Sequence, residues 1–179
     1  FNIYHLYLFM QLEEAKKQFV QAWGALGSQW GINKTMAQIH ALMILSKEPL
    51  STEEIMDELL ISRGNANMNL RELMDWGLLS KVFKAGERKD YFIGEKDVWK
   101  IAKQVAKIRK TRELDPILKL LHEIKDIDLS DKSDETKHFQ KMVNEVAKLA
   151  TNVDRLIEGI FKAEENWFWD KILKLFAKH

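Results

Sequence analysis

The sequence contains no cysteine and only two prolines among its 179 residues. Without cysteine the chain can form neither a disulfide nor a thiolate metal site, and it has no cysteine nucleophile. A reducing, cytoplasmic location is therefore the expected one. No uninterrupted apolar stretch approaches the roughly 20 residues that a helix needs to span a bilayer, so we expect no membrane partner.

The sequence also lacks the usual signatures of an enzyme. It has no phosphate-binding glycine loop and no nucleophile elbow. The histidines show no metal-ligand spacing with one another or with carboxylates; they are His5, His40, His122, His138 and His179. We expect no catalysis, no cofactor and no metal.

The net charge is only +1, but the charges are distributed unevenly. The segment from Lys81 to Arg112 holds eleven basic residues against four acidic ones, whereas residues 1–80 hold six basic and nine acidic. Such asymmetry hints at a local surface that faces a polyanion. A solvated helix face would give the same run of charges, so the pattern alone leaves both interpretations open.

The N-terminal third predicts two amphipathic helices. Between residues 11 and 30 the apolar side chains recur at spacings of three and four; they are Phe19, Trp23, Leu26 and Trp30. After Gly31, Asn33 is the predicted N-cap of a second helix. Its periodic face consists of Met36, Ile39, His40, Met43 and Ile44.

Two more helices should follow in close succession. Ser51 and Glu54 form a capping box at the start of a short helix over residues 52–60. Ser62 is the next N-cap candidate, and its helix should run to Trp76 and end at a left-handed Gly77. Two capped helices about three residues apart predict a helix-turn-helix.

Strand-forming residues come directly after this pair of helices. They predict a two-stranded hairpin over about residues 80–93, with Gly86 in its loop and Arg88 and Lys89 at its tip. A hairpin in this position is the wing of a winged helix. A long helix over residues 96–124, interrupted near Leu114 by Pro116, should follow.

The last third predicts a seam for close helix packing. Apolar residues hold three-four spacing over three heptads after the polar loop "DIDLSDKSDE"; they are Phe139, Met142, Val146, Leu149, Val153, Leu156 and Ile160. The tail "NWFWDKILKLFAKH" is aromatic and basic, and we expect it to pack in a protein interface rather than on a membrane surface.

These elements predict a mainly α fold: a winged helix-turn-helix with a two-stranded β wing and long N- and C-terminal dimerisation helices. Residues 1–9, "FNIYHLYLF", lack the basic start and cleavage site of a secretory signal. They form an apolar N-terminal extension, either a non-native remnant or an arm that tucks into a dimer. We expect the DNA-binding domain with its leading helix over residues 10–95 and the dimerisation region over residues 96–179.

The helix that starts after Ser62 carries poor helix formers where lysine or glutamate would stabilise it better. On a helical wheel one face is apolar and consists of Ala66, Leu70, Leu73, Met74 and Gly77. The opposite face holds Gly64, Asn65, Met68, Arg71 and Glu72, with Asn67 and Asn69 on the flanks. Amides, a thioether and a guanidinium suit the base edges of a DNA major groove. Asparagines near a helix start are also common caps, so the hairpin tip and the paired helices strengthen the interpretation.

The stretch from Gly24 to Phe92, and "SRGNANMNLRELMDWGL" most specifically, resembles the winged-helix domain of MarR-type transcriptional regulators, in particular the GbsR branch. The resemblance implies a homodimer, a palindromic double-stranded DNA operator and usually repression. It implies that the DNA-facing residues are Ser62, Arg63, Gly64, Asn65, Asn67, Met68, Arg88 and Lys89, to which the wheel adds Arg71.

The aromatic residues leave room for a small-molecule effector. A quaternary ammonium prefers a cage of aromatic faces, and such a cage could form from Trp23, Trp30, Trp76 and Trp99. The simpler interpretation is that these tryptophans build core and interface. An alternative to DNA binding is also open, in which the winged helix is a protein-interaction or assembly module.

Overall fold

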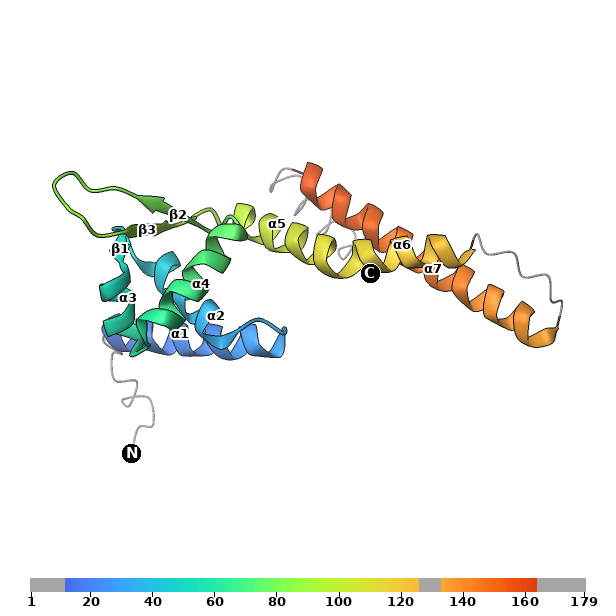
Figure 1. Cartoon of the computed structure of the whole chain (residues 1–179), viewed down its shortest axis with the longest axis horizontal. Coiled ribbons are helices and arrows are strands. Elements are labelled where there is room, and N and C mark those ends of the chain that lie inside the picture. The colour runs from blue at the N-terminus through green and yellow to red at the C-terminus, as the bar shows by residue number, and fades with distance from the viewer. Residues whose placement is uncertain (1–11, 126–132, 164–179) are drawn as a thin grey trace, which may run out of the picture. The chain divides into compact units, whose positions relative to one another are not determined.

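The computed structural model describes residues 12–125 and 133–163, and the chain divides into two compact units after Ile101 (Figure 1). The first unit comprises α1 (Leu12–Gln29), α2 (Lys34–Leu45), β1 (Leu50–Ser51), α3 (Thr52–Leu59), α4 (Arg63–Asp75), β2 (Leu79–Val82) and β3 (Tyr91–Gly94). Helix α5 (Val98–Arg109) leads into the second unit, which contains the π-helix η2 (Lys110–Leu114), α6 (Asp115–Lys125) and α7 (Asp134–Lys162). The predicted extension over residues 1–9 and the aromatic tail lie outside the described residues.

Helix α1 makes its closest approach to α2 through glycine. Its buried residues are Val20, Gly24 and Gly27. A Cβ atom on Gly27 would lie 2.5 Å from the Cβ atom of Ala37, so only glycine permits this approach. The predicted apolar face is helical as expected but stays largely exposed, with Trp30 56% accessible.

Helix α2 forms the centre of the first unit. Asn33 caps it as predicted, its side chain accepting a hydrogen bond from the amide of Met36. Ile39 and Met43 are fully buried, and His40 is 6% exposed. Because burial disfavours the charged imidazolium, the pKa of His40 is lowered from 6.5 to about 4. The histidine is therefore a neutral core residue beside Trp23.

The capping box of α3 is present as predicted. Ser51 accepts a hydrogen bond from the Glu54 amide, and the Glu54 carboxylate accepts one from the Ser51 amide. The helix ends at Leu59, one residue before the predicted end. Leu60 is its C-cap in the left-handed conformation, with φ 53°, and is 91% exposed. Leu60 therefore adds no apolar contact to α3, because the chain leaves the helix there to enter α4.

Helix α4 begins and ends as the sequence predicts. The Ser62 side chain accepts a hydrogen bond from the Asn65 amide at 3.3 Å. At the other end, Gly77 has φ 67°. The Gly77 amide donates to the Met74 carbonyl at 2.8 Å and the Leu78 amide to the Leu73 carbonyl at 2.9 Å, which is the expected Schellman motif.

The wing is part of a three-stranded antiparallel sheet in the order β1-β3-β2. The predicted hairpin corresponds to β2 and β3, whereas the two-residue strand β1 was not predicted. A Cβ atom on Gly94 would lie 3.0 Å from the Met43 carbonyl oxygen, so β3 ends against the backbone of α2. The Lys96 ammonium then donates to the carbonyls of Met43, Ile44 and Ser46. Together these contacts anchor the wing to the C-terminal end of α2.

In the second unit, the predicted interruption of the long helix is a π-helix. It spans Lys110–Leu114, directly before Pro116, which has no amide hydrogen for a helical hydrogen bond. The Lys110 ammonium lies 2.8 Å from the Asp115 carboxylate and 3.0 Å from that of Asp154 in α7. These ion pairs join η2 to α7.

Helix α7 packs against α6, yet most of its predicted seam stays exposed. Ser133 caps the helix, and Ala150 is buried. Six residues of the seam, from Phe139 to Leu156, are 38–69% exposed. Over residues 12–125 and 133–163, no helix is both long and apolar enough to cross a membrane.

Candidate nucleic-acid interface

The candidate surface is built from the N-terminal part of α4 and the wing. Helix α4 packs its apolar side on α2 and α3. Ala66, Leu70 and Leu73 are at most 1% exposed. Because this apolar side is buried in the core, the opposite side of α4 faces the solvent. Met68 is 58% exposed, and Arg71 is also exposed, as the helical wheel predicts.

The N-terminus of α4 is open to an approaching partner. A Cβ atom added to Gly64 would meet no other atom within 4 Å, so nothing in the protein requires glycine there. The Arg63 guanidinium lies 2.7 Å from the Glu53 carboxylate of α3. This hydrogen bond lowers the pKa of Glu53, and the charge of Lys89 in the wing acts in the same direction. The pair is solvent-exposed and so contributes little to stability, which leaves Arg63 available for an anion.

The three asparagines of α4 occupy different environments. Asn69 is fully buried, and its side-chain amide donates to the backbone carbonyl of Asn65 at 2.8 Å and to the Asn65 side-chain oxygen at 2.7 Å. Its predicted place on the flank is therefore wrong. Asn69 lies three residues after Ala66 and four before Leu73, which is the spacing of the core face. Asn69 has a structural role.

Asn65 is half-buried and belongs to this internal network. Its side-chain nitrogen donates to the hydroxyl of Thr35 in α2 at 3.4 Å, while its oxygen accepts from Asn69. The side chain is thereby held in one orientation. One amide hydrogen and one oxygen lone pair remain for an outside group.

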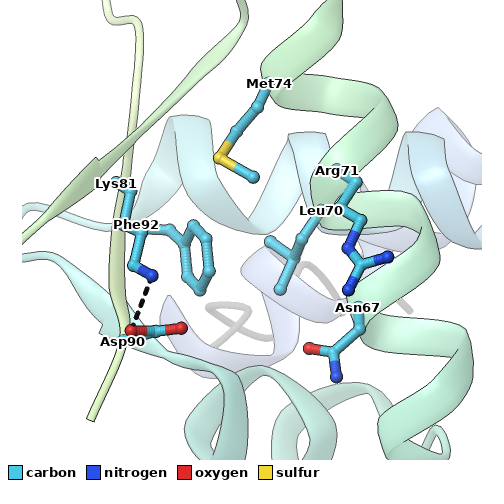
Figure 2. Close-up of a pocket in the computed structure, with 7 residues that line it drawn as sticks. All are labelled: Asn67, Leu70, Arg71, Met74, Lys81, Asp90 and Phe92. Atoms are coloured by element: carbon cyan, nitrogen blue, oxygen red, sulfur yellow. Dashed lines mark ion pairs between the residues drawn. The ribbon is translucent and has the colours of Figure 1, made fainter. Parts of the chain in front are cut away.

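Asn67 is half-buried and faces the wing across a pocket of about 230 Å³. Figure 2 shows its lining: Asn67, Leu70, Arg71 and Met74 from α4, and Lys81, Asp90 and Phe92 from the wing. The floor is apolar. At the rim the Lys81 ammonium lies 2.8 Å from the Asp90 carboxylate. Helix and wing thus form one concave surface with two cations, Arg71 and Lys81, along it.

The tip of the wing carries the predicted basic residues. Arg88 and Lys89 are both exposed in the loop between β2 and β3. Lys84 lies 4.0 Å from the centre of the Tyr91 ring. The Tyr91 hydroxyl donates a hydrogen bond to the Glu87 carboxylate, which raises the pKa of Tyr91 to about 12. These contacts order the base of the loop on the side opposite the pocket.

The four tryptophans of the predicted cage have unlike surroundings. Trp23 stacks on Phe19, with ring centres 5.4 Å apart, and also lies beside His40. Trp30 is 56% exposed, whereas Trp76 is 6% exposed at the end of α4. Trp99, in the first turn of α5, is half-buried. Core packing accounts for Trp23 and Trp76, and a cage formed by all four stays a prediction.

Two features of the wing were not predicted from the sequence. The charge pattern marks Lys96 only as one more basic residue, yet its ammonium caps the end of α2. Phe83 is a strand former in the sequence, but it is 85% exposed just beyond β2. The two-residue period of the strand could have shown that Phe83 shares a face with Lys81.

Comparisons with known proteins agree with this geometry. Residues 30–89, which include α2, α3, α4 and β2, match the profile of the MarR family. Two relatives come from Bacillus subtilis (strain 168). The HTH-type transcriptional repressor GbsR is 25% identical over 92 residues, which are 51% of this chain and 51% of GbsR. The HTH-type transcriptional repressor OpcR is 23% identical over 88 residues, 49% of this chain and 48% of OpcR.

A solved structure of a transcriptional regulator has a TM-score of 0.63 to this chain at 16% sequence identity. The match covers 82% of this chain and 95% of the chain in that structure. It shows that the fold is shared and confirms the predicted winged helix. The chain spans about half the length of the curated relatives it matches. The resemblance to the GbsR branch, which the stretch from Gly24 to Phe92 predicts, is likewise confirmed.

Proposed function

We propose that this chain is a sequence-specific, double-stranded-DNA-binding transcriptional regulator that acts as a homodimeric repressor on a palindromic operator. The observation that carries the proposal is the outward side of α4, where Met68 and Arg71 stand on a helix whose other side is fixed in the core. The basic wing continues this surface. The names of GbsR and OpcR support repression as the mode of action.

The residues divide into two roles. At the start of α4, Ser62, Arg63 and Gly64 present free amides and a guanidinium, which suit a backbone phosphate. Further along, Asn67, Met68 and Arg71 face the base edges of a major groove, and Asn65 contributes the part of its amide that the internal network leaves open. Arg88 and Lys89 add salt-sensitive affinity from the wing.

The exposed seam of α7 supports the proposal of a homodimer. Six large apolar side chains along one face of a helix, each 38–69% exposed, form a stripe of the kind that buries itself against another helix. A second copy of the chain offers a matching stripe. Two copies would present two α4 helices, and a two-fold arrangement requires an inverted repeat in the DNA.

A cytoplasmic location is part of this proposal.

If a small effector binds among the four tryptophans, calorimetry with choline or another quaternary ammonium would detect it. Heat of binding that disappears in a Trp30→Ala variant would support the cage; a protein that binds no such cation would contradict it.

The test is selection of random duplexes by the purified protein. We expect an enriched inverted repeat with half-sites about one helical turn apart. Arg71→Ala should weaken binding to the selected duplex about 10-fold or more and relax the preference at one base pair per half-site. Lys17→Ala, an exposed change in α1 outside this surface, is the matched control and should leave affinity unchanged. A selection without enrichment would overturn the proposal and favour the interaction-module alternative.

A further inference from the structure

Phe83 is a large apolar residue that the fold leaves in solvent. It is 85% exposed, whereas Phe92 on the neighbouring strand is 4% exposed. It directly follows Val82, the last residue of β2. Keeping a phenylalanine ring in water forgoes the favourable transfer that burial would give.

The geometry of the strands places Phe83 on the side of the wing that faces α4. Lys81 pairs directly with Phe92 in the antiparallel register, so the two side chains lie on one face of the sheet. This is the face that lines the pocket with Asn67 and Arg71 (Figure 2). The Lys81 ammonium lies 5.7 Å from the centre of the Phe83 ring, which puts Phe83 on the same face, one step further out.

The surroundings of Phe83 are cationic. The segment 81–90 carries Lys81, Lys84, Arg88 and Lys89 against two acidic residues, Glu87 and Asp90, and Asp90 pairs with Lys81. An apolar ring on a net basic wing fits a polyanion with an apolar interior more closely than it fits an apolar protein surface. Double-stranded DNA has this character: phosphates line the groove, and stacked base pairs lie at its floor.

We propose that Phe83 enters the minor groove beside the half-site that α4 reads and acts as an apolar wedge at a base step, while the neighbouring cations hold the flanking phosphates. Apolar side chains inserted in this way partly unstack a step and kink the duplex by roughly 20–90°. The inference rests on the proposed function and adds to it a specificity for easily unstacked pyrimidine–purine steps next to each half-site.

This role predicts a dependence on salt that differs from that of the basic residues. A wedge displaces no counterions, so Phe83→Ala should lower affinity for the selected duplex roughly 10-fold at every salt concentration. The slope of log affinity against log salt should stay as in the wild type. Lys89→Ala should instead reduce that slope by about 0.9 for each phosphate that the protein no longer neutralises.

The experiment measures affinity at several salt concentrations together with energy transfer between dyes at the two ends of the selected duplex. Wild-type protein should bring the ends closer, Phe83→Ala should not, and Phe83→Leu should keep much of the effect because leucine also serves as a wedge. Leu12→Ala, which removes another exposed apolar side chain, is the matched control. Sedimentation velocity establishes the oligomeric state of each variant.

Two results would overturn the inference while the proposed function stands. One is a Phe83→Ala variant that binds and bends the selected duplex like the wild type. The other is a Phe83→Ala variant that loses self-association, which would assign the ring to a protein contact. A wild-type protein that selects no DNA sequence would instead refute the proposed function, and this inference would fall with it.

Discussion

Two asparagines only two residues apart in α4 have different roles. Asn69 is completely buried and fixes Asn65, whereas Asn67 faces the pocket between helix and wing. The sequence predicted a helix with unusual polar residues, and that is correct. It did not separate the two roles, because a hydrophobic pattern says nothing about a polar residue that replaces an apolar one in the core.

Gly64 gives a sharp test at the scale of one residue. Alanine should stabilise α4 by about 0.5–1 kcal/mol, because glycine costs conformational entropy and a Cβ atom there meets nothing in the protein. The same methyl group should weaken DNA binding if the helix terminus approaches the phosphate backbone closely. Thermal unfolding and duplex affinity measure the two effects. A variant that is more stable and binds DNA as tightly as the wild type would contradict the close approach.

His40 makes stability depend on pH. Its pKa is about 4 when folded and 6.5 as a free side chain, so between these values the unfolded chain binds more protons. The free energy of unfolding should therefore be highest above pH 6.5 and fall as the pH drops toward 4, by on the order of 3 kcal/mol in total.

Urea unfolding of the wild type and of His40→Gln at pH 7.5, 6 and 5 would measure this dependence. The variant should lose the part of the slope that lies between pH 6.5 and 5. Glu53 and Glu54 also have lowered pKa values, but they titrate below this range and affect both proteins alike. Parallel curves for the two proteins would show that His40 is not the source.

At the scale of elements, the local signals in the sequence were reliable. The caps at Asn33, Ser51 and Ser62 and the Schellman stop at Gly77 all form as predicted. Each depends on residues within one turn of one another, so one sequence suffices to specify it. Strand β1 was missed because two residues carry no periodicity. Its pairing with β3 is a contact over some forty positions.

The two serine caps form a matched pair for mutation. Ser51→Ala and Ser62→Ala each remove one side-chain acceptor from a helix start and should each lower stability by about 1 kcal/mol or more. Ser51→Ala also removes the hydrogen bond that its hydroxyl donates to Glu54 and should cost more. Only Ser62 begins the helix proposed to read DNA. Chemical unfolding should therefore show a stability loss in both variants, and duplex affinity should fall for Ser62→Ala alone. Equal DNA affinity in the two variants would show that the cap of α4 does not contribute to DNA recognition.

At the scale of the whole molecule, the exposed apolar faces matter most. The periodicity of α7 predicts a seam, and the helix and its apolar stripe are confirmed, but within the described residues the stripe stays exposed. The aromatic side of α1 is also largely exposed, because the glycines beside it make the closest contact with α2. Hydrophobic spacing identifies a face that avoids water and does not identify its partner.

Leu149→Glu tests whether a second copy covers the seam. Leu149 is 66% exposed in the single chain, so a charge there should leave the fold intact. In a dimer it would be buried without a partner, which costs several kcal/mol and should shift the protein to monomer. Asn144→Glu, with the same charge change at an exposed position outside the seam, should stay dimeric. Sedimentation equilibrium measures the mass of the assembly that each variant forms. Assemblies of equal mass for the two variants would refute the seam as the interface.

The contacts that anchor the wing to α2 also limit how much backbone entropy the wing would lose on binding DNA. Gly94 and Lys96 fix β3 to α2, and the ladder holds the hairpin up to the pair Val82 and Tyr91. Fixing one residue of free backbone costs roughly 1–2 kcal/mol. Within the wing, only residues 83–90 lie beyond the ladder, so the entropic penalty of docking the wing is confined to this loop. Changes in loop length should therefore tune affinity while leaving the position of α4 unaltered.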